Sequence, residues 1–246
     1  MRMDRRAGLL FLRKKEISYY GTATELSKAR YNFAAASVGN YAVFGGGQTM
    51  ASSYSSVVDA YNTSLTRSTP TALSVARYSL AATSVGNYAV FGGGQTTSSN
   101  RSSVVDAYDT SLVRSTPTAL SVARSGLAAA SIGNYALLAG GYTGGYSAVV
   151  DAYNTSLTHS TPTALSVGRS GIGGTTVDSY ALFAGGGISG GHSAAVDAYG
   201  TALVHSTPSE LSVARTCVAA SINGYALFGG GLTGSASSVV DVYQVA

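Results

Sequence analysis

The sequence has no tryptophan, one cysteine, only four prolines and few charged residues, which make up 11% of its 246 positions. A single cysteine, Cys217, excludes an internal disulfide, so the fold must be held together by packing. No apolar run has the length of a membrane span, and the short run at residues 8–12 is followed by Arg13 where an export signal needs a cleavage site. We therefore expect no membrane segment and no export signal, and the cytoplasm as the default location.

Basic residues exceed acidic residues only at the start of the sequence. Residues 1–16 hold six of the 15 basic residues and two of the 11 acidic ones, so residues 17–246 hold nine of each. The net charge of +4 therefore belongs to a basic N-terminal tail, and the rest of the chain is neutral. A neutral body argues against nucleic acid as a partner.

Glycine and tyrosine are abundant, with 31 and 17 residues, and they belong to a repeat. Each unit begins with an arginine, the arginines are 45 to 47 residues apart, and each unit later contains an Asp-x-Tyr triplet. The arginines are Arg30, Arg77, Arg124, Arg169 and Arg215, and the aspartates are Asp59, Asp106, Asp151, Asp197 and Asp241. Five copies of one supersecondary unit follow from this spacing.

Each unit is predicted to contain four strands. In the second unit they cover residues 79–85, 88–91, 103–108 and 113–120, and Gly86-Asn87 between the first two suits a type I′ hairpin turn. A four-stranded meander has two apolar faces that it cannot bury alone. The units must therefore stack on one another, and a closed ring leaves no face uncovered.

The two ends of the sequence predict how the ring closes. The last unit stops after its third strand, whereas residues 20–26 align with residues 67–73, which belong to a fourth strand. We predict an all-β fold, a five-bladed β-propeller over residues 17–246, in which this N-terminal strand completes the last blade. The first strand of each unit is rich in alanine and glycine, which suits its place near the axis. We expect a monomer.

The repeated residues resemble a known family. Arg124, the Gly140-Gly141 pair after the second strand and Tyr153 in the third strand are similar to the signature of the kelch repeat, without its usual tryptophan. The resemblance covers residues 17–246. It implies a propeller, and kelch propellers commonly serve as platforms for protein recognition. A minority of them are carbohydrate-active or copper enzymes, and the fold alone does not choose among these roles.

The five repeated arginines are the first candidates for a binding site. They lie where one unit passes to the next, on the same end of the ring as the loops between the second and third strands. They form either a ring of cations for a carboxylate, phosphate or acidic peptide, or a set of structural residues that pair with the repeated aspartates. We favour the structural role, because a residue present in every blade serves packing first.

The variable loops between the second and third strands are the better candidates, because packing does not dictate their sequences. Tyrosine among Ser, Gly and Asn is typical of recognition surfaces for peptides or sugars. The candidate residues on this top face, besides the arginines, are Tyr31, Tyr54, Tyr78, Arg101, Tyr142, Tyr146 and His192. Ordinary solvated loops are the alternative.

Catalysis and metal binding have little support in the sequence. The three histidines and one cysteine make no ligand set, and the acids outside the repeat lie in turns or fourth strands. We expect no enzyme, cofactor or metal, and a module that binds a protein or peptide. The alternatives are a lectin with repeated sugar sites between blades and a repeat without a ligand.

Overall fold

The computed structural model describes residues 18–50 and 53–245, and every regular element in this part of the chain is a β-strand. The strands form five antiparallel sheets, here called blades 1 to 5, and two short hairpins. Blade 1 contains β1 (Ala34–Val38), β2 (Tyr41–Gly45), β5 (Val58–Tyr61) and β6 (Arg67–Ser68). Blade 2 contains β7 (Ala81–Val85), β8 (Tyr88–Gly92), β9 (Val105–Asp109) and β10 (Arg114–Ser115). Blade 3 contains β11 (Ala128–Ile132), β12 (Tyr135–Ala139), β13 (Val150–Asn154) and β14 (His159–Ser160).

The last two blades continue the pattern. Blade 4 contains β15 (Gly173–Val177), β16 (Tyr180–Ala184), β19 (Val196–Gly200) and β20 (His205–Ser206). Blade 5 contains only β21 (Val218–Ile222), β22 (Tyr225–Gly229) and β23 (Val240–Gln244). The hairpins are β3 (Gln48–Met50) with β4 (Ser53–Tyr54), and β17 (Gly187–Ile188) with β18 (Gly191–His192). The predicted all-β fold of repeated antiparallel units is confirmed, and no helix in the described residues is long and apolar enough to span a membrane.

The first three strands of each blade match the prediction, but the fourth does not. In blade 2 the predicted strand over residues 113–120 shrinks to the two residues of β10. Pro117 lacks the N–H that would continue the ladder, and the chain then crosses to the next blade. There the carbonyl of Thr118 accepts a hydrogen bond of 2.8 Å from the hydroxyl of Tyr153.

The hairpin turns between first and second strands occur where they are predicted, with one difference in type. The first turn residue has a positive φ, from 45° at Asp178 to 52° at Gly133. The second residue has a positive φ only at Gly224, so the type I′ turn is found in blade 5 alone. The other four turns have the sign pattern of a type II′ turn, which also fits a two-residue hairpin.

The hydrophobic core is divided into clusters that lie between successive blades. Between blades 1 and 2, for example, Val43 and Val58 of one blade pack with Phe91 and Tyr108 of the next. Three further clusters join blade 2 to 3, blade 3 to 4 and blade 4 to 5. Each blade therefore has a leading face, toward the following blade, and a trailing face, toward the preceding one.

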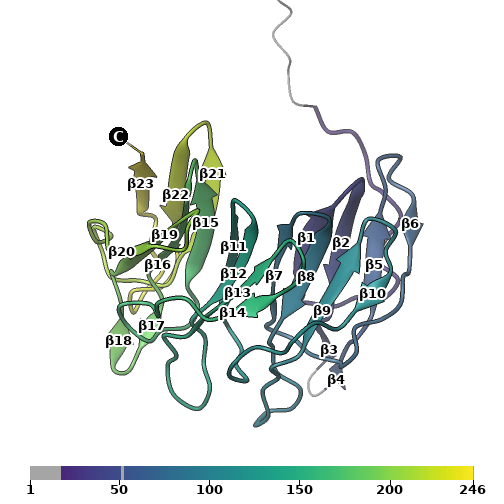
Figure 1. Ribbon diagram of the computed structural model, residues 1–246, viewed down its shortest axis with the longest axis horizontal. Coiled ribbons are helices and arrows are strands. Elements are labelled where there is room, and N and C mark those ends of the chain that lie inside the picture. Colours follow the sequence, from purple (N-terminus) through teal and green to yellow (C-terminus); the bar gives the residue numbers. More distant parts are fainter. Residues whose placement is uncertain (1–17, 51–52, 246) are drawn as a thin grey trace, which may run out of the picture.

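The blades follow one another along an open arc, with blades 1 and 5 at its two ends (Figure 1). The predicted closure of the ring is not confirmed, because the sheet of blade 5 has three strands and residues 18–29 contribute none. Part of the N-terminal segment contacts blade 1. The Ser27 N–H donates to Asp59, and Tyr61 donates to the Thr24 carbonyl, as equivalent residues do at each later junction.

One end of the arc carries both the crossovers between blades and the loops between second and third strands. The residue after each repeated arginine pairs with the start of that loop in the first four blades, as in Tyr31 with Gln48, Tyr78 with Gln95 and Ser125 with Tyr142. The predicted convergence of these segments on one end is confirmed. We call this end the loop face.

Candidate functional site

The repeated arginines are buried and paired with the repeated aspartates. Arg77 and Asp106 are both fully buried, and an arginine Nη lies 2.7 Å from a carboxylate oxygen. The same pair is formed by Arg30 with Asp59, Arg124 with Asp151, Arg169 with Asp197 and Arg215 with Asp241. Each arginine also donates to a backbone carbonyl of the second strand of its blade, as Arg77 does to Phe91 at 3.2 Å.

Each aspartate binds two groups: the arginine of its own blade, and the crossover segment that arrives from the preceding blade. Asp151 accepts a hydrogen bond from the Ser121 N–H at 2.9 Å and lies 2.6 Å from His159 Nε2. Burial raises the pKa of Asp151, but Arg124 and Ser121 outweigh burial, so its pKa lies below the usual range. Burial lowers the pKa of Arg124, and Asp151 opposes this shift. The pair therefore remains ionised inside the protein.

These contacts assign the five arginines a structural role, the one that the sequence favours. A guanidinium with no exposed surface cannot touch a ligand, so Arg30, Arg77, Arg124, Arg169 and Arg215 do not belong to the binding surface. The alternative prediction, a ring of exposed cations, is wrong because the guanidinium groups are buried. A buried charge requires a charged or hydrogen-bonding partner, and the aspartate provides it.

The tyrosines predicted on the loop face make contacts across blade boundaries. Tyr54, from the loop of blade 1, stacks on Tyr78 of blade 2, with ring centroids 4.9 Å apart and planes 9° apart. Burial, Tyr54 and Tyr31 together raise the pKa of Tyr78. The first two blades thus share one aromatic surface.

The next boundary carries a second set of contacts. The Arg101 guanidinium, from the loop of blade 2, lies 4.8 Å from the ring centroid of Tyr142 in blade 3. Tyr142 packs edge to face against Tyr146 at 5.5 Å. Arg101 donates one hydrogen bond, from Nη1 to the Ser99 carbonyl, and its buried Nε has no partner among the described residues.

We call this group the tyrosine cluster. Its members come from blades 1 to 3 and are Tyr31, Tyr54, Tyr78, Arg101, Tyr142 and Tyr146. His192, the remaining candidate, lies in β18 of blade 4, paired with Gly187. A Cβ at Gly187 would lie 3.7 Å from the Tyr146 ring, so the cluster ends at the edge of blade 4.

Gly168 supports the cluster, and sequence reasoning missed it. The other four units carry alanine at this position: Ala29, Ala76, Ala123 and Ala214. At Gly168 a Cβ would lie 2.6 Å from the Tyr146 carbonyl oxygen, so alanine does not fit there. The signal was available in the sequence, as the single departure from alanine at a repeated position.

The chemistry of the cluster is that of recognition. Partly exposed tyrosine rings offer apolar faces and hydroxyl groups, and the partly exposed Arg101 adds a positive charge beside them that suits a carboxylate or carbonyl oxygen. The five loops contain no acidic residue. Among residues 18–50 and 53–245, no three His, Cys, Asp or Glu side chains form a group suited to a metal ion.

Comparisons with known proteins address the fold. No protein-family model matches this sequence, and no curated protein matches it. A solved structure described as "Structure of YjhT" is similar, with a TM-score of 0.71 and 15% sequence identity. The match covers 88% of this chain and 82% of that one. At this identity the likeness shows the fold alone, and with the repeated four-stranded sheets it supports a β-propeller; the kelch resemblance is not confirmed.

Proposed function

We propose that this chain is a non-enzymatic recognition module that binds a protein or peptide across the tyrosine cluster of its loop face. The observation that carries the proposal is a pair of contacts across two successive blade boundaries, Tyr54 on Tyr78 and Arg101 on Tyr142. The two are linked within blade 2, where the backbones of Tyr78 and Arg101 both pair with Gln95. Tyrosine gives a large contact area at a small cost in side-chain entropy, and such anchors dominate binding surfaces.

The unequal distribution of the tyrosines favours one partner over many equivalent sugar sites. The loops of blades 4 and 5, residues 188–193 and 232–237, contain no tyrosine, whereas Tyr142 and Tyr146 both lie in the loop of blade 3. A lectin with a site between every pair of blades requires similar residues at each boundary. A single asymmetric surface suits a peptide or a protein loop better.

Asp109, an acid outside the repeat, has a local structural role, which supports a function without catalysis. Asp109 accepts hydrogen bonds from the Ser111 and Val113 N–H groups and so forms the turn before the fourth strand, as Asn62 and Asn154 do in other blades. A hydrolase requires two carboxylates that converge on a substrate. We therefore place the activity in binding alone.

The proposal is tested by panning a random peptide-display library and probing a glycan array with the same protein. We expect enrichment of related peptides whose affinity falls at least ~10-fold with Tyr78→Ala, Arg101→Ala or Tyr142→Ala. Val113→Ser is the control, because Val113 is exposed but lies in the turn between third and fourth strands, away from the loop face. Saturable glycan binding with no peptide enrichment, or peptide affinity that none of the three substitutions changes, would refute the proposal.

A closed five-bladed ring belongs to this proposal, because closure makes the loop face continuous. Its support is the match between the two ends of the arc. Val240 on the leading face of blade 5 is 54% exposed, whereas its equivalent Val150 in blade 3 is 1% exposed. On blade 1, Phe44 and Tyr61 line an apolar hollow. The equivalent residues of blade 2, Phe91 and Tyr108, are fully buried.

Backbone groups at the two ends match as well. At each of the four junctions a glycine N–H donates to the carbonyl of the next repeated arginine, as Gly94 does to Arg124 at 2.9 Å. The corresponding Gly231 N–H and Arg30 carbonyl have no partner within the described residues. We propose that they bond to each other in the closed ring.

A further inference from the structure

Short backbone pairings on the loop face place three residues of each blade side by side in a row. In blade 2, Gln95 pairs with Tyr78 on one side and with Arg101 on the other. Residues directly opposite each other in antiparallel segments project from the same face, so these three side chains are neighbours. The equivalent rows are Tyr31, Gln48 and Tyr54 in blade 1, Ser125, Tyr142 and Tyr146 in blade 3, Ser170, Gly187 and His192 in blade 4, and Thr216, Leu232 and Ala236 in blade 5.

The rows of blades 1 to 3 join end to end at the blade boundaries. Tyr54, the last residue of the first row, stacks on Tyr78, the first residue of the second. Arg101, the last residue of the second row, lies over the ring of Tyr142 in the third. Along this line Arg101 therefore has tyrosine on both sides, Tyr78 in its own row and Tyr142 in the next. The rows of blades 4 and 5 contain no tyrosine, so the line of aromatic rings covers one part of the loop face.

Arg101 is the one charged residue in the rows of blades 1 to 3. Its guanidinium donates one hydrogen bond, from Nη1 to the Ser99 carbonyl at 3.1 Å, and it forms no salt bridge among the described residues. The five loops contain no acidic residue, and the repeated aspartates are paired with the buried arginines. The remaining described acids are Asp109 and Asp178, in turns at the opposite end of the strands, and Glu25 and Glu210, in the crossovers that lead into blades 1 and 5. The positive charge of Arg101 is therefore not neutralised by the loop face.

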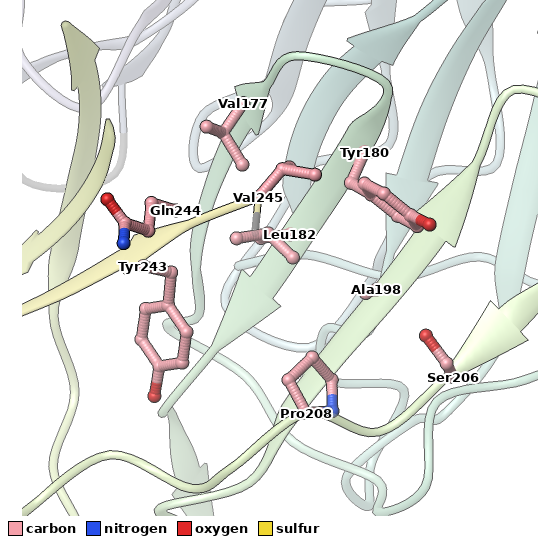
Figure 2. Close-up of a pocket in the computed structure, with 9 residues that line it drawn as sticks. All are labelled: Val177, Tyr180, Leu182, Ala198, Ser206, Pro208, Tyr243, Gln244 and Val245. Carbon is pink, nitrogen blue, oxygen red and sulfur yellow. The ribbon is translucent and has the colours of Figure 1, made fainter. Parts of the chain in front are cut away.

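An apolar hollow of about 210 Å³ between blades 4 and 5 offers a different chemistry (Figure 2). Val177 and Leu182 of blade 4 and Tyr243 of blade 5 line it, and no charged side chain does. The residues of blade 3 equivalent to Val177 and Leu182 are Ile132 and Leu137, which belong to the hydrophobic cluster between blades 3 and 4. The hollow is therefore part of the packing between blades, and we look for ligand recognition on the loop face.

We propose that the tyrosine cluster recognises an acidic residue within a peptide, with its carboxylate on Arg101 and apolar side chains of the peptide on the tyrosines to both sides. A carboxylate matches the planar fork of donors of a guanidinium, and the Ser99 carbonyl and the Tyr142 ring hold this guanidinium in place before binding. Because tyrosine rings flank Arg101 on both sides, the acid should lie between two apolar residues and not at the end of the peptide. The inference rests on the proposed function and names the class of peptide.

The test uses the full-length protein and short synthetic peptides blocked at both ends. Each peptide carries Glu, Gln or Lys at its centre and Leu or Phe at the second position on each side, since an extended chain turns alternate side chains to the same face. We expect the Glu peptides to bind at least ~10-fold more tightly than the Gln peptides, and Arg101→Gln to abolish this difference. Arg114→Gln is the matched control, because it removes a positive charge from the fourth strand of the same blade, where Arg114 lies 3.5 Å from Asp106. It should leave the preference for Glu unchanged.

Charge exchange supplies a second readout, which a purely structural role of Arg101 would not produce. Arg101→Glu should reverse the preference, so that the Lys peptides bind this variant more tightly than the Glu peptides do. Added salt should weaken binding of the Glu peptides to the wild type and leave binding of the Gln peptides unchanged, because salt screens an exposed ion pair. Peptides with Gln at the centre and a free C-terminus test whether a terminal carboxylate can replace the acidic side chain.

The outcomes separate this inference from the proposed function. Equal affinities for the Glu and Gln peptides, a preference for Glu that survives Arg101→Gln, or binding that requires a free C-terminus would each overturn the inference. If Tyr78→Ala still weakens binding in these cases, the proposed function stands without a role for an acidic residue. Absence of binding by every synthetic peptide and by the display library would overturn both.

Discussion

Removal of one buried arginine should destabilise the whole protein, and Arg124→Met is the sharpest case. Arg124 and Asp151 are both fully buried, so methionine would leave a carboxylate inside the protein with only Ser121 and His159 as partners. Breaking a buried pair from one side costs about 3–5 kcal/mol. Because two partners remain, we expect a loss of about 3 kcal/mol in the free energy of unfolding.

The assay is urea unfolding followed by circular dichroism at neutral pH. The double variant Arg124→Met/Asp151→Asn removes both charges and keeps an acceptor for the Ser121 N–H, so it should be more stable than the single variant. Arg101→Ala is the control, because this arginine is partly exposed, and a change within about 0.5 kcal/mol is expected. A loss below about 1 kcal/mol for Arg124→Met would refute a structural role for the buried pairs.

Three further predictions follow from the same contacts. The pKa values of the Asp59, Asp151 and Asp241 carboxyl groups lie below the usual range, so the stability that these ionised groups contribute is complete at pH 7 and is lost as the pH falls through their pKa values. The melting temperature should therefore decrease when the pH falls below about 4, and an unchanged melting temperature from pH 7 to 3 would contradict this. Tyr153→Phe removes the hydrogen bond to the Thr118 carbonyl and should cost about 1 kcal/mol in urea unfolding, whereas no change would show that water replaces the hydroxyl. Leu157 packs against the hydrophobic cluster between blades 2 and 3, so Leu157→Ala should lower the free energy of unfolding by about 2–3 kcal/mol. Val204→Ser is the exposed control, and equal effects of the two substitutions would contradict the packing role of Leu157.

The sequence allows most of the blade architecture to be predicted, because strands and turns depend on local pattern. Gly86-Asn87 between two apolar segments specifies a hairpin without reference to the rest of the chain. The prediction of the fourth strand was wrong because that prediction also depends on local pattern. Ser115 still pairs with Ala107 of its own blade, but Thr118 accepts a hydrogen bond from Tyr153 of the next blade, and that partner is not visible in a local pattern.

The candidate site divides in the same way. Repetition correctly favours a structural role for residues such as Arg77, because every blade needs the same contacts. Contacts within the tyrosine cluster, such as Tyr54 on Tyr78, depend on how two loops approach across a blade boundary, and sequence spacing does not determine that approach. Gly168 shows that a departure from the repeat marks a position where the packing differs from that of the other blades.

Gly230→Ala tests directly whether the five blades form the proposed closed ring. At the equivalent Gly93, with a φ of 68°, a Cβ would lie 2.6 Å from the Arg124 carbonyl oxygen of the next blade. Gly230 has a φ of 62°, yet in the open arc its Cβ would meet nothing closer than Ser237 O at 3.6 Å.

Closure would bring the Arg30 carbonyl against Gly230, so Gly230→Ala should destabilise the protein as much as Gly93→Ala in urea unfolding. A cost of only about 1 kcal/mol for Gly230→Ala, the strain of alanine at a positive φ, beside a much larger cost for Gly93→Ala would show that the ring is open.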